Sequence, residues 1–230
     1  MRQRKAKDLD KRMEACGAWL TRLPLAEHGG DAPGAWERDE SRDLFLEIGC
    51  GKGDFLIAKA LADPGSDYLG MEGQETVLLR ALEKARETGG GAEDTGDTPA
   101  ASSPLSNLRF VCDYVRSLMD LFPEGSLAGI YLNFSDPWPK ARHVKRRLTW
   151  RGRLKEYAQA IRPGGAIEFK TDNDDLFAFT LEEIAACGWT PAEETWDLHG
   201  TDLPAREVMT EYEKKFLRAG KKIHYVKVIV

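Results

Sequence analysis

Short apolar runs alternate with amphipathic stretches along most of the chain, and this alternation constrains the fold more than any other feature. The run DLFLEIG (43–49) is typical of a buried strand, and apolar residues recur at helical spacing in the stretch that follows it (52–63). Further strand-like runs occupy 67–73, 107–114, 128–134, 166–172, about 189–196 and 223–230, and helical patterns occupy 74–87, 150–161, 176–188 and 210–220. Strands that alternate with helices of this length form parallel crossover units. The sequence therefore predicts an α/β fold with a doubly wound sheet.

Two helix boundaries carry specific signals. The helix over 150–161 is expected to stop at RPGG (162–165), because proline and glycine both interrupt helices. The helix over 210–220 begins at Thr210, and Glu213 follows at the spacing of a capping box. These two residues are therefore expected to exchange hydrogen bonds with each other's backbone.

The composition favours one globular domain with two appended features. The 230 residues are 42% hydrophobic and 31% charged. We expect a basic N-terminal arm or helix over 1–40, a main domain over 41–230 and, within it, a flexible surface insertion over 88–106 that is rich in Gly, Ser, Pro and acids.

The sequence favours a cytoplasmic protein without a membrane or metal partner. No apolar run is long enough to span a membrane, and the N-terminus lacks the apolar core of a signal peptide. The four cysteines stand far apart without a CxxC pair, which favours reduced thiols over disulfides or a zinc site. Monomer and homodimer both stay open.

Positive charge is concentrated in one stretch of a chain whose net charge is −5. Eight Lys or Arg residues and no acid lie between Lys140 and Lys155. Such segregation favours an anionic partner such as a nucleic acid. The alternative is a solvated helix face without a partner.

The stretch EIGCGKGD places glycines at 49, 51 and 53 between a predicted strand and a predicted helix. Glycines at such a turn let the backbone bend tightly and let a ligand approach the main chain. The spacing is neither GxGxxG nor that of a phosphate-binding loop. Glu47, two residues earlier, would repel a phosphate and favours a ligand with positive charge or hydroxyl groups.

Two more acids end the next two predicted strands. Glu72 stands where doubly wound folds hold ribose hydroxyls, and Asp113 could reach the base of a nucleoside. Together with Glu47 they describe a pocket for a cationic nucleoside, which S-adenosylmethionine fits. The alternative is a structural turn whose acids only cap helices.

The longest motif follows the fourth predicted strand. It reads YLNFSDPWPKARHVKRRLT, and EIGCGKGDF, RPGGAIEFKTDN and VMTEYEKKF accompany it. In this order, from about Leu44 to Val230, these stretches resemble the bacterial tRNA (guanine-N7-)-methyltransferases. The resemblance implies a class I, Rossmann-like, S-adenosylmethionine-dependent methyltransferase with a mostly parallel seven-stranded sheet and an antiparallel last strand. It implies methyl transfer to N7 of guanosine 46 in the variable loop of tRNA.

The resemblance also implies roles for particular residues. S-Adenosylmethionine would be bound by Glu47, Glu72, Asp113 and Asp136 together with the glycine loop (Gly49, Gly51, Gly53). The substrate would be bound by Lys140, Asp172, Thr210, Glu211, Tyr212 and Glu213. The RNA would be contacted by the basic run Arg142, His143, Val144, Lys145, Arg146 and Arg147, and we expect Arg151 and Arg153 to lie along phosphates as well.

The chemistry agrees with Asp136 as the catalytic residue. N7 of guanine carries a lone pair and no proton, so its methylation needs no general base. Pro137 and Pro139 fix the backbone beside Asp136. A carboxylate held there could stabilise the positive charge that arrives on the purine, and Asp172 is a second candidate. Trp138 could stack on a base, or it could pack beneath its own loop.

Two other functions stay open at this point. One is a methyltransferase that acts on another RNA or on a small base. The other is a non-catalytic RNA-binding subunit that keeps a cofactor pocket for stability.

Overall fold

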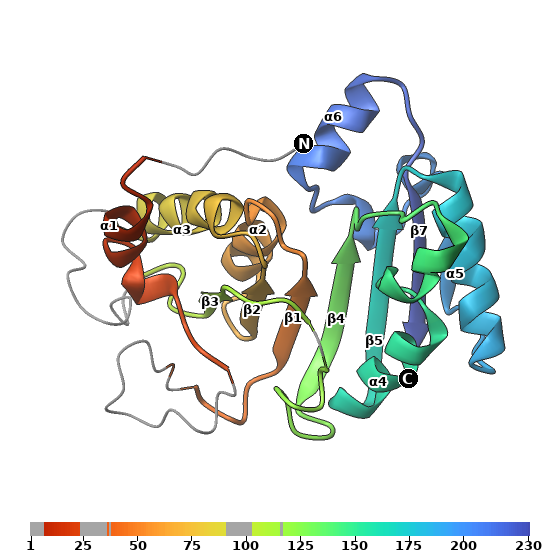
Figure 1. The fold of residues 1–230 in the computed structure, drawn as a ribbon, viewed down its shortest axis with the longest axis horizontal. Helices are drawn as coiled ribbons and strands as arrows, with labels where there is room; N and C mark the ends of the chain where they lie inside the picture. The colour runs from red at the N-terminus through yellow and green to blue at the C-terminus, as the bar shows by residue number, and fades with distance from the viewer. Residues whose placement is uncertain (1–6, 24–35, 37, 91–102, 116) are drawn as a thin grey trace. The chain divides into compact units, whose positions relative to one another are not determined.

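The computed structural model describes residues 7–23, 36, 38–90, 103–115 and 117–230 (Figure 1). These residues form two units, Met1–Arg116 and Ser117–Val230. Each unit holds its own strands and the helices that cover them.

Three parallel strands form the sheet of the first unit. β1 (Leu44–Ile48) pairs with β2 (Asp67–Met71), and β2 pairs with β3 (Leu108–Val111), both in parallel. Every residue of β2 and β3 is buried, as expected for parallel strands that are covered on both faces. Helices α2 (Asp54–Ala62) and α3 (Glu75–Gly89) supply the crossovers, so β1, β2 and β3 end at the same edge.

The described part of the N-terminal arm packs on the first unit. It contains α1 (Leu9–Glu14) and the short 3-10 helix η1 (Gly17–Trp19). Trp19 is fully buried, and the guanidinium of Arg12 donates to the carboxylate of Glu83 on α3 at 2.8 Å. These residues of the arm therefore form part of the fold of the first unit.

The second unit contains four strands. β4 (Leu127–Asn133) pairs in parallel with β5 (Ile161–Thr171), and β7 (His224–Ile229) is antiparallel to both β5 and β6 (Glu193–Thr195). With the three strands of the first unit they make the seven strands of a mixed sheet. The predicted mostly parallel seven-stranded sheet with an antiparallel last strand is confirmed.

The two faces of the β5–β7 sheet are covered by different elements. On one face, α4 (Arg151–Ala160) and α5 (Asp174–Ala186) pack against residues such as Phe169 and Val226. Tyr225, the neighbour of Val226 in the chain, points to the opposite face, where it packs with α6 (Glu211–Arg218) and the turns before it. Those turns are the 3-10 helices η5 (Leu198–Gly200) and η6 (Pro204–Arg206).

The predicted boundary at RPGG is wrong in one respect. The helix does end before it, at Ala160, but β5 begins at Ile161 and includes the four residues rather than starting after them. Pairing with β4 shifts across this stretch, from Leu127↔Ile161 to Gly129↔Ala166, so the residues form a bulge. Gly164 supports the bulge with φ +82°, and its N–H donates to the carbonyl of Val230 at 2.8 Å.

The two ends of the predicted insertion over 88–106 are packed rather than loose. Leu105 is fully buried, and the Ser103 hydroxyl donates to the Gly89 carbonyl at 2.7 Å. A side chain at Gly89 would collide with the Trp19 ring. Residues 91–102, the greater part of the insertion, lie outside the described residues.

Candidate active site

The three glycines after β1 adopt backbone angles that other residues rarely adopt. Their φ values are +77° at Gly49, +58° at Gly51 and +76° at Gly53. No atom lies within 4 Å of a Cβ added at Gly49 or Gly51, so the backbone is bare beside open space. At Gly53 an added Cβ would lie 2.8 Å from the Cβ of Ala81 on α3. The first two glycines therefore form an accessible backbone cradle, and the third lets α3 approach.

The three predicted acids of the first unit lie at or just after the ends of its strands, and Glu72 contacts the cradle directly. Glu47 lies on β1 with 2% of its surface exposed. Glu72 follows β2, and its carboxylate accepts hydrogen bonds from the Gly51 N–H at 3.2 Å and the Gln74 N–H at 2.9 Å. Asp113 follows β3 and accepts from the Tyr114 N–H at 2.6 Å. The predicted grouping of the glycine loop with Glu72 is therefore present in the structure.

Two further residues, Cys50 and Tyr114, lie close to the glycines and acids that follow the strands of the first unit. Burial, with Glu47 and Glu72 nearby, raises the pKa of the Cys50 thiol well above its ordinary value, so Cys50 is an inert filler. The Tyr114 ring, 62% exposed, occupies the space that a side chain at Gly73 would need. Sequence reasoning did not single out Tyr114.

The loop after β4 in the second unit is more strained than its prolines suggested. Phe134 and Trp138 have φ of +52° and +42°, in the left-handed region that bulky residues avoid. Asp136 lies between them and is exposed. Left-handed residues with large side chains persist only where the surroundings fix them. The backbone on both sides of Asp136 is therefore held by packing as well as by proline rings.

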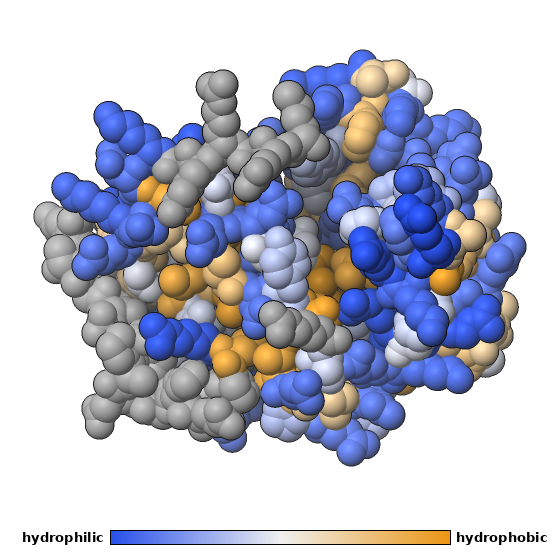
Figure 2. Space-filling view, in the orientation of Figure 1, coloured by the Kyte–Doolittle hydropathy of each residue, from blue (hydrophilic) through white to orange (hydrophobic). Residues whose placement is uncertain are grey.

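The basic run forms the 3-10 helix η4 (Ala141–Arg146), with Arg142, Lys145 and Arg146 exposed. Strongly hydrophilic side chains gather at this part of the molecule in Figure 2. The Arg146 guanidinium lies 4.9 Å from the centre of the Trp138 ring, and His143 contacts the same ring edge-on at 5.5 Å. Trp138 is therefore half-buried beneath its own basic run, which supports the packing alternative.

Arg151, in the basic cluster after η4, forms an ion pair within the second unit. The Arg151 guanidinium donates to both carboxylate oxygens of Glu183 on α5, at 2.7 and 2.9 Å. These bonds and the Arg151 N–H hold the pKa of Glu183 below its usual value. This side chain ties α4 to α5 while half of it stays exposed, and its expected place along phosphates stays a prediction.

The predicted substrate-binding residues differ widely in exposure. Lys140 is exposed, and Asp172 is half-buried with Lys221 at 2.5 Å from its carboxylate. Thr210 and Glu213 form the predicted capping box of α6, and Glu213 is fully buried. Only Glu211 and Tyr212 of that segment are exposed.

Sequence reasoning missed the residues that hold this segment. Lys170 on β5 is 3% exposed and lies 3.3 Å from the Glu213 carboxylate, and His199 Nε2 lies 2.8 Å from it. The available signal was a lysine within the strand run 166–172, because a lysine that a sheet buries needs a partner.

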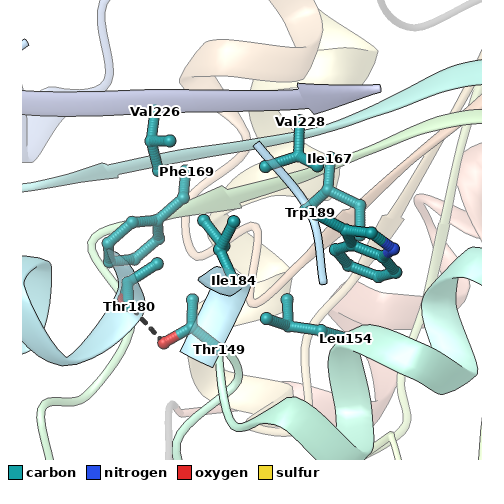
Figure 3. A pocket seen from close by; sticks show the side chains of 9 residues that line it. All are labelled: Thr149, Leu154, Ile167, Phe169, Thr180, Ile184, Trp189, Val226 and Val228. Atoms are coloured by element: carbon teal, nitrogen blue, oxygen red, sulfur yellow. Dashed lines mark hydrogen bonds between the residues drawn. The ribbon is translucent and has the colours of Figure 1, made fainter. Parts of the chain in front are cut away.

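A small cavity in the second unit is not part of this machinery (Figure 3). It measures about 10 Å³, room for about one water molecule. Apolar side chains of α4, α5, β5 and β7 line it, and the Thr180 hydroxyl donates to Thr149 Oγ1 at its edge at 2.8 Å. It is a packing gap of the core.

Among the described residues, no group of His, Cys, Asp and Glu side chains could hold a metal ion. No helix within the described ranges is both long and apolar enough to cross a bilayer.

Solved structures show the class of fold. A structure described as an antibiotic-related methyltransferase aligns over 99% of this chain and 97% of its own, with a TM-score of 0.56 at 15% identity. A 16S rRNA (adenine(1408)-N(1))-methyltransferase from Catenulisporales acidiphilia aligns over 94% and 97%, with a TM-score of 0.57 at 17% identity. This likeness shows the class I methyltransferase fold.

Sequence comparisons then give the family. A family model described as "Putative methyltransferase" matches residues 41–226. The tRNA (guanine-N(7)-)-methyltransferase of Mesoplasma florum is 44% identical over 81% of this chain and 80% of its own. That of Lachnoclostridium phytofermentans is 40% identical over 83% of each. The chain belongs to the tRNA (guanine-N(7)-)-methyltransferase family.

The cofactor of such an enzyme is S-adenosylmethionine, and the first unit fits it. The bare backbone at Gly49 and Gly51 leaves room for a ligand against the main chain. Carboxylates at Glu47, Glu72 and Asp113 suit a ligand with a sulfonium, an ammonium and ribose hydroxyls. A polyphosphate would be repelled by the same three groups.

Proposed function

We propose that this protein transfers the methyl group of S-adenosylmethionine to N7 of a guanosine in tRNA, at position 46 of the variable loop. The observation that carries the proposal is the 44% identity to a tRNA (guanine-N(7)-)-methyltransferase over 81% of the chain. The open glycine cradle beside Glu72 supports it. Because tRNA is the substrate, we place the reaction in the cytoplasm.

In this proposal the first unit holds the cofactor. The carboxylate of Glu72 would accept the ribose hydroxyls, and Asp113 would contact the adenine side of the nucleoside. Glu47 would lie near the positive end of the methionine part. Bound in this way, S-adenosylmethionine supplies a methyl group attached to a positively charged sulfur. When the sulfur–carbon bond breaks, the sulfur is left as a neutral thioether.

Asp136 is the proposed catalytic residue. The N7 lone pair forms the new bond to carbon, and the positive charge moves to the purine. An exposed carboxylate fixed between Phe134 and Trp138 can stabilise that charge as it arrives, and can accept hydrogen bonds from the guanine N1–H and N2–H. No side chain has to remove a proton.

The second unit also supplies the proposed contacts to RNA. The exposed cations of η4, Arg142, Lys145 and Arg146, would lie along phosphates and add affinity without reading bases. Lys140, Asp172 and the exposed part of the segment Thr210–Glu213, Glu211 and Tyr212, would hold the nucleotide. Contacts of these substrate-binding residues with the edge of the base would orient the guanine ring.

The experiment is methylation of unmodified tRNA with labelled cofactor. We expect one labelled guanosine, at a site that mild reduction and aniline cleave. Label on another RNA but not on tRNA would favour a different RNA methyltransferase. Cofactor binding without label on any RNA would favour a non-catalytic RNA-binding protein.

A further inference from the structure

Lys170 carries a buried charge that the proposed reaction does not use. Its side chain comes from β5 and is 3% exposed. Its ammonium donates to the carbonyls of Ala205 at 2.5 Å and Val208 at 3.0 Å, and lies 3.3 Å from the carboxylate of Glu213. Burying such a pair is costly unless every donor and acceptor is satisfied. The Lys170 ammonium is therefore held in place by specific partners in the fold.

Glu213 is committed to the interior. It is fully buried at the first turn of α6, and its carboxylate faces Lys170, His199 Nε2 at 2.8 Å and the Thr210 N–H at 3.4 Å. In return, the Glu213 N–H donates to the Thr210 hydroxyl at 2.9 Å. A carboxylate with these three donors cannot reach a nucleotide unless the start of α6 comes apart.

The segment before α6 depends on this anchor. Between Leu198 and Thr210 the chain forms only two three-residue 3-10 helices. Two of its carbonyls, those of Ala205 and Val208, bind the Lys170 ammonium. Lys170 lies opposite Tyr225 in the β5–β7 ladder, on the face that α6 covers. The rigid sheet therefore fixes the turn through this one ammonium and the apolar contacts around Tyr225.

The outer side of the same turn presents an aromatic ring. Tyr212 is 53% exposed and stacks on Phe216, with ring centres 6.4 Å apart and planes 27° apart. Tyr212 is the neighbour of Glu213 in the chain. The position of the buried Glu213 carboxylate therefore fixes the position of the Tyr212 backbone and ring. Exposed aromatic rings at RNA-binding sites stack on unpaired bases.

We propose that Lys170 is a positioning residue for tRNA: through Glu213 it fixes the first turn of α6 so that Tyr212 contacts the substrate nucleotide. This inference rests on the proposed function. It divides the Thr210–Glu213 segment into an inner pair, Thr210 and Glu213, that holds the turn and an outer residue, Tyr212, that touches RNA.

The test combines Lys170→Met with Tyr212→Ala in full-length protein. We expect each single variant to raise KM for tRNA about tenfold, the worth of one stacked base, with kcat changed less than threefold. The KM for tRNA of the double variant should be little higher than that of the single variant with the higher KM, because both changes remove the same contact. Effects that multiply fully, or an unchanged KM in Lys170→Met, would overturn the proposal.

Two controls separate positioning from general loss of stability. Leu154→Ala enlarges the core cavity on the opposite face of the sheet and should lower Tm without raising KM for tRNA. If it raises KM as Lys170→Met does, the effect is general and the proposal fails. Lys170→Met/Glu213→Gln removes both charges, avoids an unpaired buried carboxylate, and should fold and show the same higher KM.

Cofactor binding and wild-type activity distinguish a failure of the proposed function from a failure of the role proposed for Lys170. The dissociation constant of S-adenosylmethionine, measured by calorimetry, should stay within twofold in Lys170→Met. Wild-type protein that does not methylate tRNA would refute the proposed function. Wild-type activity with a Lys170→Met variant that behaves like Leu154→Ala would refute only this inference.

Discussion

The ring of Phe134 packs against the ring of Phe216, with centres 5.8 Å apart. Phe134 is the first residue after β4 and leads into the Asp136 loop, whereas Phe216 lies on α6. The Phe134 N–H also donates to the carbonyl of Lys170 at 2.9 Å. One side chain therefore joins the proposed catalytic loop to the helix that carries Tyr212.

Substitutions at Phe134 should show an inverted order of stability. Its φ is +52°, where glycine is at ease and alanine is strained. The free energy of unfolding should therefore be about 1 kcal/mol larger for Phe134→Gly than for Phe134→Ala. At most positions the glycine variant is the less stable of the two proteins. Urea unfolding of both variants measures the difference, and the usual order would contradict the left-handed backbone. Both variants should lose turnover, because Asp136 loses its anchor.

The glycine cradle can be tested with a matched pair. Gly49 and Gly188 have nearly equal φ, +77° and +79°, and neither has an atom within 4 Å of an added Cβ. Gly49→Ala and Gly188→Ala should each cost about 1 kcal/mol of stability. Only Gly49→Ala should weaken S-adenosylmethionine binding, by at least tenfold in calorimetry. Equal cofactor affinity in the two variants would place the ligand elsewhere.

The basic run should determine the salt dependence of tRNA binding. Removing two exposed cations in Arg142→Ala/Lys145→Ala should lower the slope of log K against log salt by about 1.5. Arg151→Gln is the control, because Glu183 already holds this guanidinium at 2.7 Å and it should leave the slope unchanged. Filter binding at several salt concentrations gives both slopes. An effect of Arg151→Gln alone would show that the RNA follows α4 instead of η4.

The Arg151–Glu183 pair should contribute to stability only above acidic pH. Its hydrogen bonds lower the pKa of Glu183 in the folded state below the ordinary value of 4.5. A carboxyl with a depressed folded pKa stabilises the protein above its unfolded pKa and loses that effect as pH falls through the folded pKa. The difference in unfolding free energy between wild type and Glu183→Gln should therefore be constant from pH 7 to about 5 and shrink below pH 4. A difference that grows on acidification would contradict the pairing.

The sequence predicted the fold well where the signal was local. Strand runs such as 67–73 contain β2, and the Thr210–Glu213 spacing gave the capping box, because burial pattern and capping act over a few residues. The RPGG bulge was missed as part of β5, since its pairing with Val230 joins residues far apart in the chain.

The site was predicted in residue type more than in geometry. Glu47, Glu72 and the glycines could be found from their places after strands. No local pattern announces a left-handed Phe134 or Trp138, because their packing fixes those angles against their own preference. The partnership of Lys170 with Glu213 likewise joins residues 43 positions apart, beyond any spacing rule.

The most direct measurement compares wild type with Asp136→Asn in single-turnover methylation of unmodified tRNA. The account predicts one methylated guanosine, cleaved by aniline after reduction, and a rate lowered at least a hundredfold in Asp136→Asn, about 2.7 kcal/mol of lost transition-state stabilisation. Cofactor affinity should stay within about tenfold. An unchanged rate in Asp136→Asn, or label at a position that aniline does not cleave, would contradict the account.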